Sequence, residues 1–220
     1  MKHLLVFAKA PKPGEVKTRL QLPADAAAQL HAAFVKDVLA RHGHLDCQLS
    51  LWRGSDPNDP FWTAFDVPQY EQRGRSLGER MASASETMLA SPADSVVIIG
   101  TDSPSLPPRL IEEAFVALSD CDVVLGPACD GGYYLVGLRR TIPALFPKTM
   151  PWGTNTVLQE TIEILARGGY SYRLLEFWYD VDRPDDLKLL GTHVRYLEDL
   201  GVPAPKHTIR CLSELGLSND

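Results

Sequence analysis

The run SVVIIG at residues 95–100 constrains the fold more than any other stretch of the sequence. It is rich in β-branched residues, too short for a helix and apolar at consecutive positions, so it predicts a strand with both faces buried. Such strands lie at the centre of parallel sheets that helices cover on both sides. The sequence therefore predicts an α/β fold.

Strand-like runs and helical patterns alternate along most of the chain. Strands are expected at 3–8, 47–54, 67–72, 95–100, 122–126, 132–138 and 170–176, and helices at 24–43, 76–91, 107–118, 153–169 and 182–201. Because parallel strands need right-handed crossovers, the alternation predicts a mainly parallel mixed sheet between helix layers. The length favours one domain over 1–220, with residues 202–220 as a C-terminal extension that is docked or partly mobile.

The charge balance limits the class of partner. The net charge is −6, whereas a general nucleic-acid binder would be basic, so we expect a small-molecule partner, no nucleic acid, and an anion site that is built locally. No apolar run approaches the ~18 residues of a membrane span. Residues 1–8 are too short for a secretory signal, so no membrane partner is expected.

The cysteines indicate a reducing compartment. None of Cys47, Cys121, Cys129 and Cys211 forms a CxxC pair, which disfavours zinc and dithiol chemistry. We expect four reduced thiols in a cytoplasmic protein.

Positive charge gathers in one stiff loop after the first expected strand. The loop, KAPKPGEVKTRL at residues 9–20, holds four cations, two prolines and Gly14, but no Walker pattern. Gly14 permits a positive φ or a close backbone approach. Lys17 and Arg19 can hold phosphate oxygens, the guanidinium as a forked pair. The alternative is an ordinary solvated surface loop.

Aspartates follow the other expected strands. Ligands of open α/β sheets bind at the carboxyl ends of strands, so Asp102 is placed to coordinate Mg²⁺ or Mn²⁺, or else to form a turn that caps the next helix. Asp180 and Asp182 are two residues apart and would point to the same side of an extended segment, where a cation would relieve their repulsion. Asp182 could instead cap the last helix.

Three further candidates each have a structural alternative. Asp130, in the segment CDGG at 129–132, could bind sugar hydroxyls or act as a base, but Asp-Gly is also a strong hairpin signal. Arg80 could lie on the rim of a nucleotide site or simply near a helix start. Trp152 could line an acceptor pocket or pack in the core, and Thr154 could cap the helix that follows.

Six segments occur in the order FAKAPKPGEVKTRL, QRGRSLGERM, GTDSPSLP, DGGYYLVGL, PWGTNTV and DVDRPDDL. Over about residues 4–190 they resemble the bacterial radical-SAM/selenodomain-associated transferases, also described as arsenosugar-biosynthesis-type glycosyltransferases. The resemblance implies the nucleotide-diphospho-sugar transferase superfamily and its GT-A fold, a Rossmann-like three-layer α/β/α sandwich. The K-x-R-L element and the late Asp-x-Asp segment also resemble phospholactate guanylyltransferase and the nucleotidyltransferase that makes molybdopterin guanine dinucleotide.

The resemblance also implies roles for individual residues. It places Lys17 and Arg19 in a phosphate loop and Asp130 in the sugar or acceptor region, so that Asp130 and Lys17 become the catalytic candidates. Asp102 falls where GT-A enzymes hold a metal, but the motif here has one acid, so Asp180 or Asp182 must supply the second. The expected substrate-binding set is Ala8, Lys9, Pro13, Gly14, Lys17, Arg19, Arg80, Gly131, Gly132 and Trp152.

The function expected from these features is a nucleotide-dependent transferase. The leading hypothesis is a glycosyltransferase that uses a nucleotide-diphospho-sugar donor, a small-molecule acceptor and Mg²⁺ or Mn²⁺. The alternative is a nucleotidyltransferase that joins an NTP to a phosphorylated acceptor and releases pyrophosphate. A third hypothesis is a nucleotide-binding regulatory module without a metal site. The nucleobase, sugar, acceptor and oligomeric state have no signature in the sequence.

Overall fold

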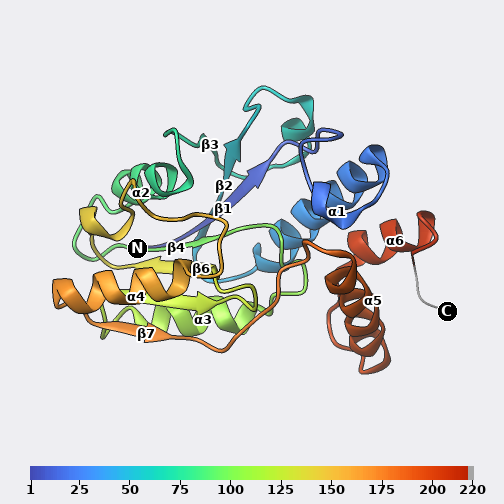
Figure 1. Ribbon diagram of the computed structural model, residues 1–220. Coiled ribbons are helices and arrows are strands. Elements are labelled where there is room, and N and C mark those ends of the chain that lie inside the picture. Colours follow the sequence, from blue (N-terminus) through green and yellow to red (C-terminus); the bar gives the residue numbers. More distant parts are fainter. Residues whose placement is uncertain (218–220) are drawn as a thin grey trace.

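A seven-stranded sheet forms the centre of the computed structural model, which describes residues 1–217 (Figure 1). Its strands are β1 (Lys2–Lys9), β2 (Gln48–Gly54), β3 (Gln69–Glu71), β4 (Ser95–Ile99), β5 (Val123–Pro127), β6 (Tyr133–Leu138) and β7 (Tyr172–Leu174). They lie in the order β3-β2-β1-β4-β6-β5-β7. Only β6 runs antiparallel to its neighbours in this sheet, so the expected mainly parallel mixed sheet is confirmed.

Helices cover both faces of the sheet. They are α1 (Ala24–His42), α2 (Leu77–Met88), α3 (Pro108–Ala117), α4 (Val157–Gly168), α5 (Pro184–Asp199) and α6 (Lys206–Glu214), with short 3₁₀ helices η1 (Thr18–Leu20), η2 (Pro60–Ala64) and η3 (Pro143–Leu145). Apolar residues of α1 and α3 pack on one face, and those of α2, α4 and η3 pack on the other. A third apolar cluster joins α5 and α6 to α1, beside the sheet (Figure 1).

The strand β4 has the double burial that its sequence predicts. Val97 and Ile99 face the layer of α1 and α3, whereas Val96 and Ile98 face the layer of α2 and α4. All four side chains are almost fully buried. Burial of one such side chain contributes about 1.5–3 kcal/mol, so the centre of the sheet holds the two helix layers together.

Helix ends follow the sequence signals at one helix and depart from them at another. At α2 the Ser76 hydroxyl accepts from the N–H of Glu79 (3.2 Å), while the Glu79 carboxylate accepts from Arg75 (2.8 Å) instead of Ser76. The expectation that Thr154 caps α4 is wrong. Its hydroxyl donates to the Pro151 carbonyl (2.8 Å), so it closes the preceding turn and the helix begins only at Val157.

The part of the C-terminal extension that forms α6 is docked on α1. The buried carboxylate of Asp37, on α1, accepts from the N–H groups of His207 (3.0 Å) and Thr208 (2.6 Å) and from the Thr208 hydroxyl (2.6 Å). A carboxylate at the first turn satisfies donors that the helix leaves unpaired. Residues 218–220 of the expected extension lie outside the described residues.

Two further expectations concern cysteines and membrane spans. All four cysteines are free thiols, as expected. Among residues 1–217, none of the helices combines the length and the apolar character that crossing a bilayer requires.

Candidate functional site

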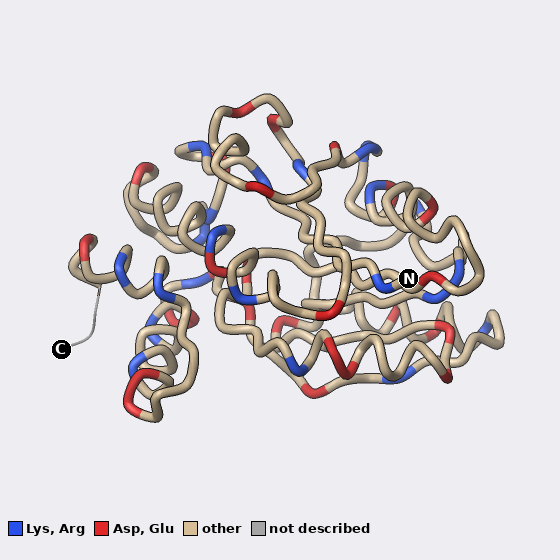
Figure 2. Tube along the Cα trace, turned by 180° about the vertical axis from the view of Figure 1, so that it is seen from behind, with Lys and Arg blue, Asp and Glu red and all other residues tan. Residues whose placement is uncertain are grey.

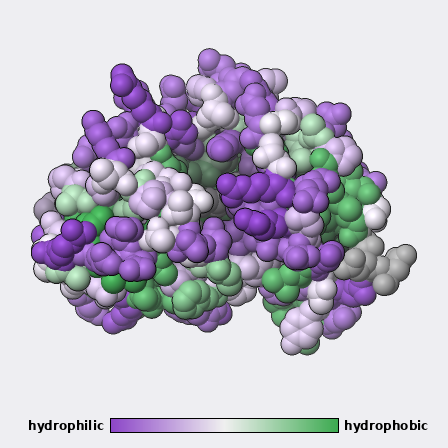
Figure 3. Space-filling model, in the orientation of Figure 1, coloured by the Kyte–Doolittle hydropathy of each residue, from purple (hydrophilic) through white to green (hydrophobic). Residues whose placement is uncertain are grey.

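A cavity of about 600 Å³ opens at the carboxyl ends of β1 and β4. The chain leaves β1 for β2 on one side of the sheet, and β4 lies on the other side, so the strand order switches at this point. Figure 3 shows a hollow near the middle of this view, with hydrophilic residues gathered around it. Eight predicted site residues line the cavity: Ala8, Lys9, Lys17, Arg19, Arg80, Asp102, Asp180 and Asp182.

The cationic loop and the acidic segments meet at the ammonium group of Lys17. Its Nζ lies 2.5 Å from Oδ1 of Asp102 and 3.0 Å from Oδ1 of Asp182, and donates to the Val181 carbonyl at 2.7 Å. The Lys17 side chain is 3% exposed, whereas those of Asp102 and Asp182 are 47% and 39% exposed. The carboxylates thus bind the lysine on one side and face the cavity on the other.

The segment between β7 and α5 carries Asp180 and Asp182 across the sheet. Hydrogen bonds from Trp178 N to Pro127 O (3.0 Å) and from Val181 N to Asp102 O (2.8 Å) fasten it to the ends of β5 and β4. As the spacing predicts, both carboxylates line the same cavity.

Arg183, not Asp182, is the N-cap residue of the last helix, α5. The carboxylate of Asp186, in the first turn, accepts from the N–H groups of Asp182 (3.1 Å) and Arg183 (2.7 Å), ahead of α5. Because the cap position belongs to Arg183, one residue later, the Asp182 carboxylate faces Lys17 instead. The alternative that Asp182 is a helix cap is therefore wrong.

Opposite charges hold the Lys17 contacts in their ionised form. Burial alone would raise the pKa of Asp102, but the neighbouring Lys17 ammonium outweighs it and the net shift is downward. Burial alone would lower the pKa of Lys17, but Asp102 and Asp182 outweigh it and the net shift is upward. Lys17 and Asp102 are therefore both charged at neutral pH, and the charge of each offsets the cost of burying the other.

Asp180 has the opposite tendency. Burial raises the pKa of this carboxyl to about 7, and the charges of Asp102, Asp130 and Asp182 act in the same direction. The Ser103 hydroxyl donates to Asp180 Oδ1 at 2.6 Å, which moderates the shift. Asp180 therefore exchanges its proton near neutral pH.

We expect Asp180→Asn to stabilise the protein in a pH-dependent way. An acid whose pKa is raised on folding contributes stability below its unfolded value near 3.8 and loses it as the pH rises through about 7. An amide carries no charge at any pH, so the free energy of unfolding should rise by roughly 2 kcal/mol at about pH 8 and by little at about pH 4. Urea unfolding at the two pH values measures this. An equal gain at both would show that Asp180 does not titrate as described.

Three cations of the cavity have no carboxylate partner within residues 1–217. They are Lys9 at the end of β1, Arg19 in η1 and Arg80 in α2, whose Nε donates to the Gly74 carbonyl at 3.1 Å. Lys12 instead pairs with Asp56 at 2.5 Å and does not line the cavity. Charges of both signs are interspersed along the chain (Figure 2). These three cations of the cavity are thus a local cluster, not a part of a broad basic surface.

Two residues of the loop adopt left-handed backbone angles. Gly14 has φ 79°, and a side chain there would meet open space, so conformation alone selects glycine. Lys17 has φ 50°, which is uncommon for a residue with a Cβ. Its ammonium lies 5.3 Å from the centre of the Phe34 ring, an arrangement that adds a cation–π contact.

The Asp-Gly-Gly segment forms the hairpin between β5 and β6. The Asp130 carboxylate accepts from Gly132 N–H at 2.8 Å within that turn. Gly131 has φ 91°, and a Cβ there would lie 2.2 Å from the Asn155 carbonyl oxygen, so close packing on residue 155 requires glycine. The structural reading of this motif is therefore correct, and a role in sugar or acceptor binding stays a prediction.

Several expected binding residues lie away from the cavity wall. Pro13, Gly14, Asp130, Gly131, Gly132 and Trp152 are not among its lining residues. The half-buried Trp152 ring packs against Phe146 (6.4 Å between centroids) and Tyr133 (6.3 Å), so it contributes to the core cluster beneath α2. A role of Trp152 in an acceptor pocket likewise stays a prediction.

Sequence reasoning missed several polar residues of the cavity wall, among them His31 and Gln72. His31, on α1, is 4% exposed and its Nε2 donates to the Lys9 carbonyl at 3.1 Å. Burial lowers the pKa of His31, so the ring is neutral and fixes the end of β1. Gln72 donates to the Trp52 carbonyl at 2.8 Å. The sequence did carry a signal for His31, because it is a polar residue among the alanines on the buried face of its helix. Gln72 carried no such signal.

The donor set around Lys17 suits a hard cation. Two carboxylates and the Val181 carbonyl converge on the ammonium, and Mg²⁺ and Mn²⁺ prefer such oxygen ligands. Residues 1–217 contain no group of three or more His, Cys, Asp or Glu side chains arranged to hold a metal. Asp102 and Asp182 would thus hold an ion together with its other oxygen ligands, as Mg²⁺ sites with few protein carboxylates do.

Comparison with known proteins finds a matching family model and a similar solved structure. A model of the family described as uncharacterized bacterial proteins (DUF2064) matches residues 25–154. A protein from Desulfovibrio desulfuricans G20, provisionally named a nucleotide-diphospho-sugar transferase, is 30% identical over 100% of this chain and 99% of its own, with a TM-score of 0.84. No protein with a curated function matches the sequence significantly.

Two more distant structures share the fold. The 4-diphosphocytidyl-2C-methyl-D-erythritol synthase of Anaerococcus prevotii DSM 20548 is 10% identical over 88% of this chain and 99% of its own, with a TM-score of 0.56. The CMP:2-keto-3-deoxy-manno-octonic acid synthetase, solved with CTP, is 14% identical over 91% of this chain and 99% of its own, with a TM-score of 0.51.

Proposed function

This chain belongs to the DUF2064 family and to the nucleotide-diphospho-sugar transferase superfamily, and from this premise we propose that it is a nucleotide-dependent transferase. The finer proposal is a glycosyltransferase with a nucleotide-diphospho-sugar donor, and residues 1–220 as one catalytic domain. The observation that carries it is the convergence of Lys17 and Asp102, 2.5 Å apart, in a cavity of about 600 Å³ at the strand-order switch. Cavities of this size and position hold small ligands in α/β proteins.

The donor's phosphates would bind the free cations of the cavity. Arg19 and Lys9 are exposed beside the end of β1, and Arg80 lines the same cavity from α2. A guanidinium binds two phosphate oxygens at once, and an ammonium adds a point charge. As the sugar–phosphate bond breaks, these cations would stabilise the charge that develops on the leaving nucleoside diphosphate.

A divalent ion fits the proposal as a partner of the acidic side chains. Asp102 and Asp182 would hold it, and Asp180 would join them once it has lost its proton. When bound, Mg²⁺ or Mn²⁺ neutralises phosphate charge and acts as a Lewis acid. In this proposal Asp130 orients the sugar or accepts the proton of the acceptor hydroxyl, and Trp152 supports the acceptor side.

A nucleotidyltransferase is the second candidate. Three cations without a carboxylate partner in residues 1–217, in addition to Lys17, suit the charge of a nucleoside triphosphate. An acceptor phosphate would then attack the α-phosphorus and pyrophosphate would leave. The same cations would stabilise either leaving group. Glycosyl and nucleotidyl transfer therefore differ in the donor that binds, not in the cavity residues that they require.

A thermal-shift panel separates the two candidates. The protein is melted with GTP, CTP, UTP, UDP-glucose and GDP-mannose, each with and without Mg²⁺. A ligand at 100 times its Kd adds about 2.7 kcal/mol, a shift of roughly 5–10 °C for a domain of this size. A larger shift with a nucleotide sugar supports glycosyl transfer. A larger shift with an NTP, together with pyrophosphate release when a phosphorylated acceptor is added, supports nucleotidyl transfer, and no shift with any of them contradicts both.

We expect Arg19→Ala to weaken the shift given by the best ligand of this panel. The guanidinium is exposed in the cavity, and its loss removes a charge-assisted contact worth about 1.5–3 kcal/mol, or roughly 10- to 100-fold in affinity. The matched control is Arg195→Ala, which removes an exposed arginine of α5 that does not line the cavity. Equal shifts in the two variants would show that the phosphates bind elsewhere.

A further inference from the structure

The ammonium of Lys17 has no donor left for a phosphate. A lysine has three N–H donors, and three oxygens surround this one: Asp102 at 2.5 Å, the Val181 carbonyl at 2.7 Å and Asp182 at 3.0 Å. In the conformation described, Lys17 is therefore bound to the protein itself. Arg19, two residues later, keeps its guanidinium in the cavity without an ion-pair partner in residues 1–217.

The position of Lys17 is held in place by these contacts. Its backbone is left-handed (φ 50°), a conformation that costs free energy in a residue with a Cβ and that persists only where surroundings impose it. Its side chain is 3% exposed and packs on the Phe34 ring. Release of the three oxygen contacts would remove what opposes a swing of the side chain toward the cavity.

The ammonium and a divalent ion would compete for the same two oxygen atoms, Oδ1 of Asp102 and Oδ1 of Asp182. A Mg²⁺ ion bound by these two atoms at ~2.1 Å would stand close to where the Lys17 Nζ now stands, and two cations at that distance repel. Their binding to the carboxylate pair is thus competitive. Phosphate groups in the cavity offer Lys17 a second set of anionic partners, which the ion-free protein lacks.

We propose that Lys17 is an internal substitute for the divalent ion, which holds the Asp102–Asp182 pair until phosphate groups draw its ammonium into the cavity and the ion takes its place. The inference rests on the proposed function for the identity of the phosphate ligand. It makes the ion and the phosphates favour each other's binding, because each binds best when Lys17 has moved. Lys17 thus couples the binding of the ion to the binding of the phosphates. Once the ion has replaced it at the carboxylates, Lys17 becomes a phosphate ligand.

The test measures the affinity of the nucleotide-free protein for Mn²⁺. The electron paramagnetic resonance signal of free Mn²⁺ reports how much of the ion is bound. Lys17→Met keeps the buried stem and removes the competing charge, so it should bind Mn²⁺ at least about tenfold more tightly than wild type. Lys9→Met is the matched control, since it removes the same charge from the same cavity but from a lysine without contact to the carboxylates. It should alter the affinity by less than about threefold. Equal affinity of Lys17→Met and wild type would overturn the proposal.

A second measurement uses the wild-type chain, so that it does not depend on the folding of a variant. Lysines are acetylated with a limiting reagent and quantified by mass spectrometry. Lys17 should react much more slowly than the exposed Lys9, and saturating Mn²⁺ should raise its rate at least about fivefold relative to Lys9. Lys17 that stays protected while Mn²⁺ is bound would refute the exchange. Both measurements omit nucleotide, so they can succeed even if the nucleotide panel shows that the proposed function is wrong.

Discussion

The Asp102→Asn variant is expected to lose the Mg²⁺ dependence of nucleotide binding and roughly 10³-fold of the transfer rate. Asp102 follows the central strand β4, faces the cavity with a half-exposed carboxylate and forms the shortest contact of Lys17. An asparagine of the same shape is a neutral and poorer ligand for a hard cation, and it also leaves the Lys17 ammonium with one carboxylate fewer. The rate loss corresponds to the several kcal/mol that a metal contributes to charge stabilisation.

The measurement is the thermal shift given by the best nucleotide, with and without Mg²⁺, followed by the rate with that donor. Asp185→Asn is the control, because Asp185 is a 90% exposed carboxylate of α5 that pairs with Lys188 outside the cavity. It should keep both the Mg²⁺ dependence and the rate. A normal Mg²⁺ response in Asp102→Asn would place the ion elsewhere, and with it the candidate acidic set.

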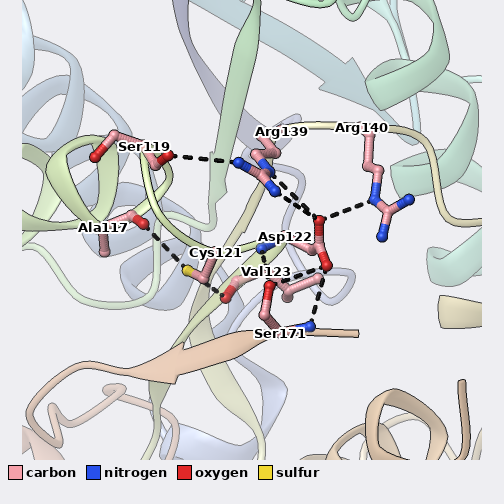
Figure 4. Close-up of polar contacts among 8 residues, drawn as sticks. All are labelled: Ala117, Ser119, Cys121, Asp122, Val123, Arg139, Arg140 and Ser171. Atoms are coloured by element: carbon pink, nitrogen blue, oxygen red, sulfur yellow. Dashed lines mark hydrogen bonds and ion pairs between the residues drawn. The ribbon is translucent and has the colours of Figure 1, made fainter. Parts of the chain in front are cut away.

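The second large effect concerns stability. Asp122→Ala should lower the free energy of unfolding by about 2–3 kcal/mol, or roughly 5–10 °C in Tm. The Asp122 side chain is 7% exposed and accepts from Arg139 (3.2 Å), Arg140 (2.9 Å) and both N–H and hydroxyl of Ser171 (3.0 Å each), as Figure 4 shows. It thus joins the start of β5 to the end of β6 and to the entry of β7. The two arginines are about half exposed and regain water, which limits the loss.

The matched control and the pH dependence sharpen this prediction. Asp120→Ala removes an exposed carboxylate two residues earlier and should change stability by less than about 0.5 kcal/mol. Burial alone would raise the pKa of Asp122, but the bonds from Arg140, Ser171 and Arg139 outweigh it and lower the pKa from 3.8 to about 2. Its contribution is therefore present above the unfolded value and is lost as the pH falls through about 2.

Unfolding of wild type and Asp122→Ala by urea checks both points. The difference between them should be constant above about pH 5 and should shrink as the pH falls toward about 2, because the wild-type carboxyl then takes up a proton. A difference that stays the same down to that pH would mean that the neutral carboxyl serves the network as well as the ion does. Asp120→Ala should follow wild type at every pH.

The sequence predicted the elements that depend on local patterns. The strand at residues 95–100 and the helix at 24–43 are found within a few residues of their expected bounds, because side-chain periodicity and β-branching act within the element itself. The observed start of a helix differs from the predicted one where a side chain can bond to either of two backbone groups. Thr154 had the signal of a helix cap, but its hydroxyl bonds backward to Pro151, so α4 begins later.

The candidate site divides in the same way. Charge and position after a buried strand were enough to select Lys17 and Asp102. Whether the Asp182 carboxylate capped a helix or faced a cation depended on where the helix begins, and its N-cap is Arg183, one residue later. The Asp-Gly-Gly signal was equally open between turn and ligand site. The packing of Gly131 on Asn155 decides that the turn is real.

The sequence by itself determined the alternation of strands and helices, the burial of the central strand and the types of charged residue after the strand ends. Only the tertiary structure decided that Lys17, Asp102 and Asp182 meet at one point, and that the lysine there binds the two carboxylates. The physical reason is range. Propensity and periodicity act over a few residues, whereas electrostatic contacts act through space between segments that lie 80 or more residues apart in the chain, and only the packed sheet brings them within a few ångströms.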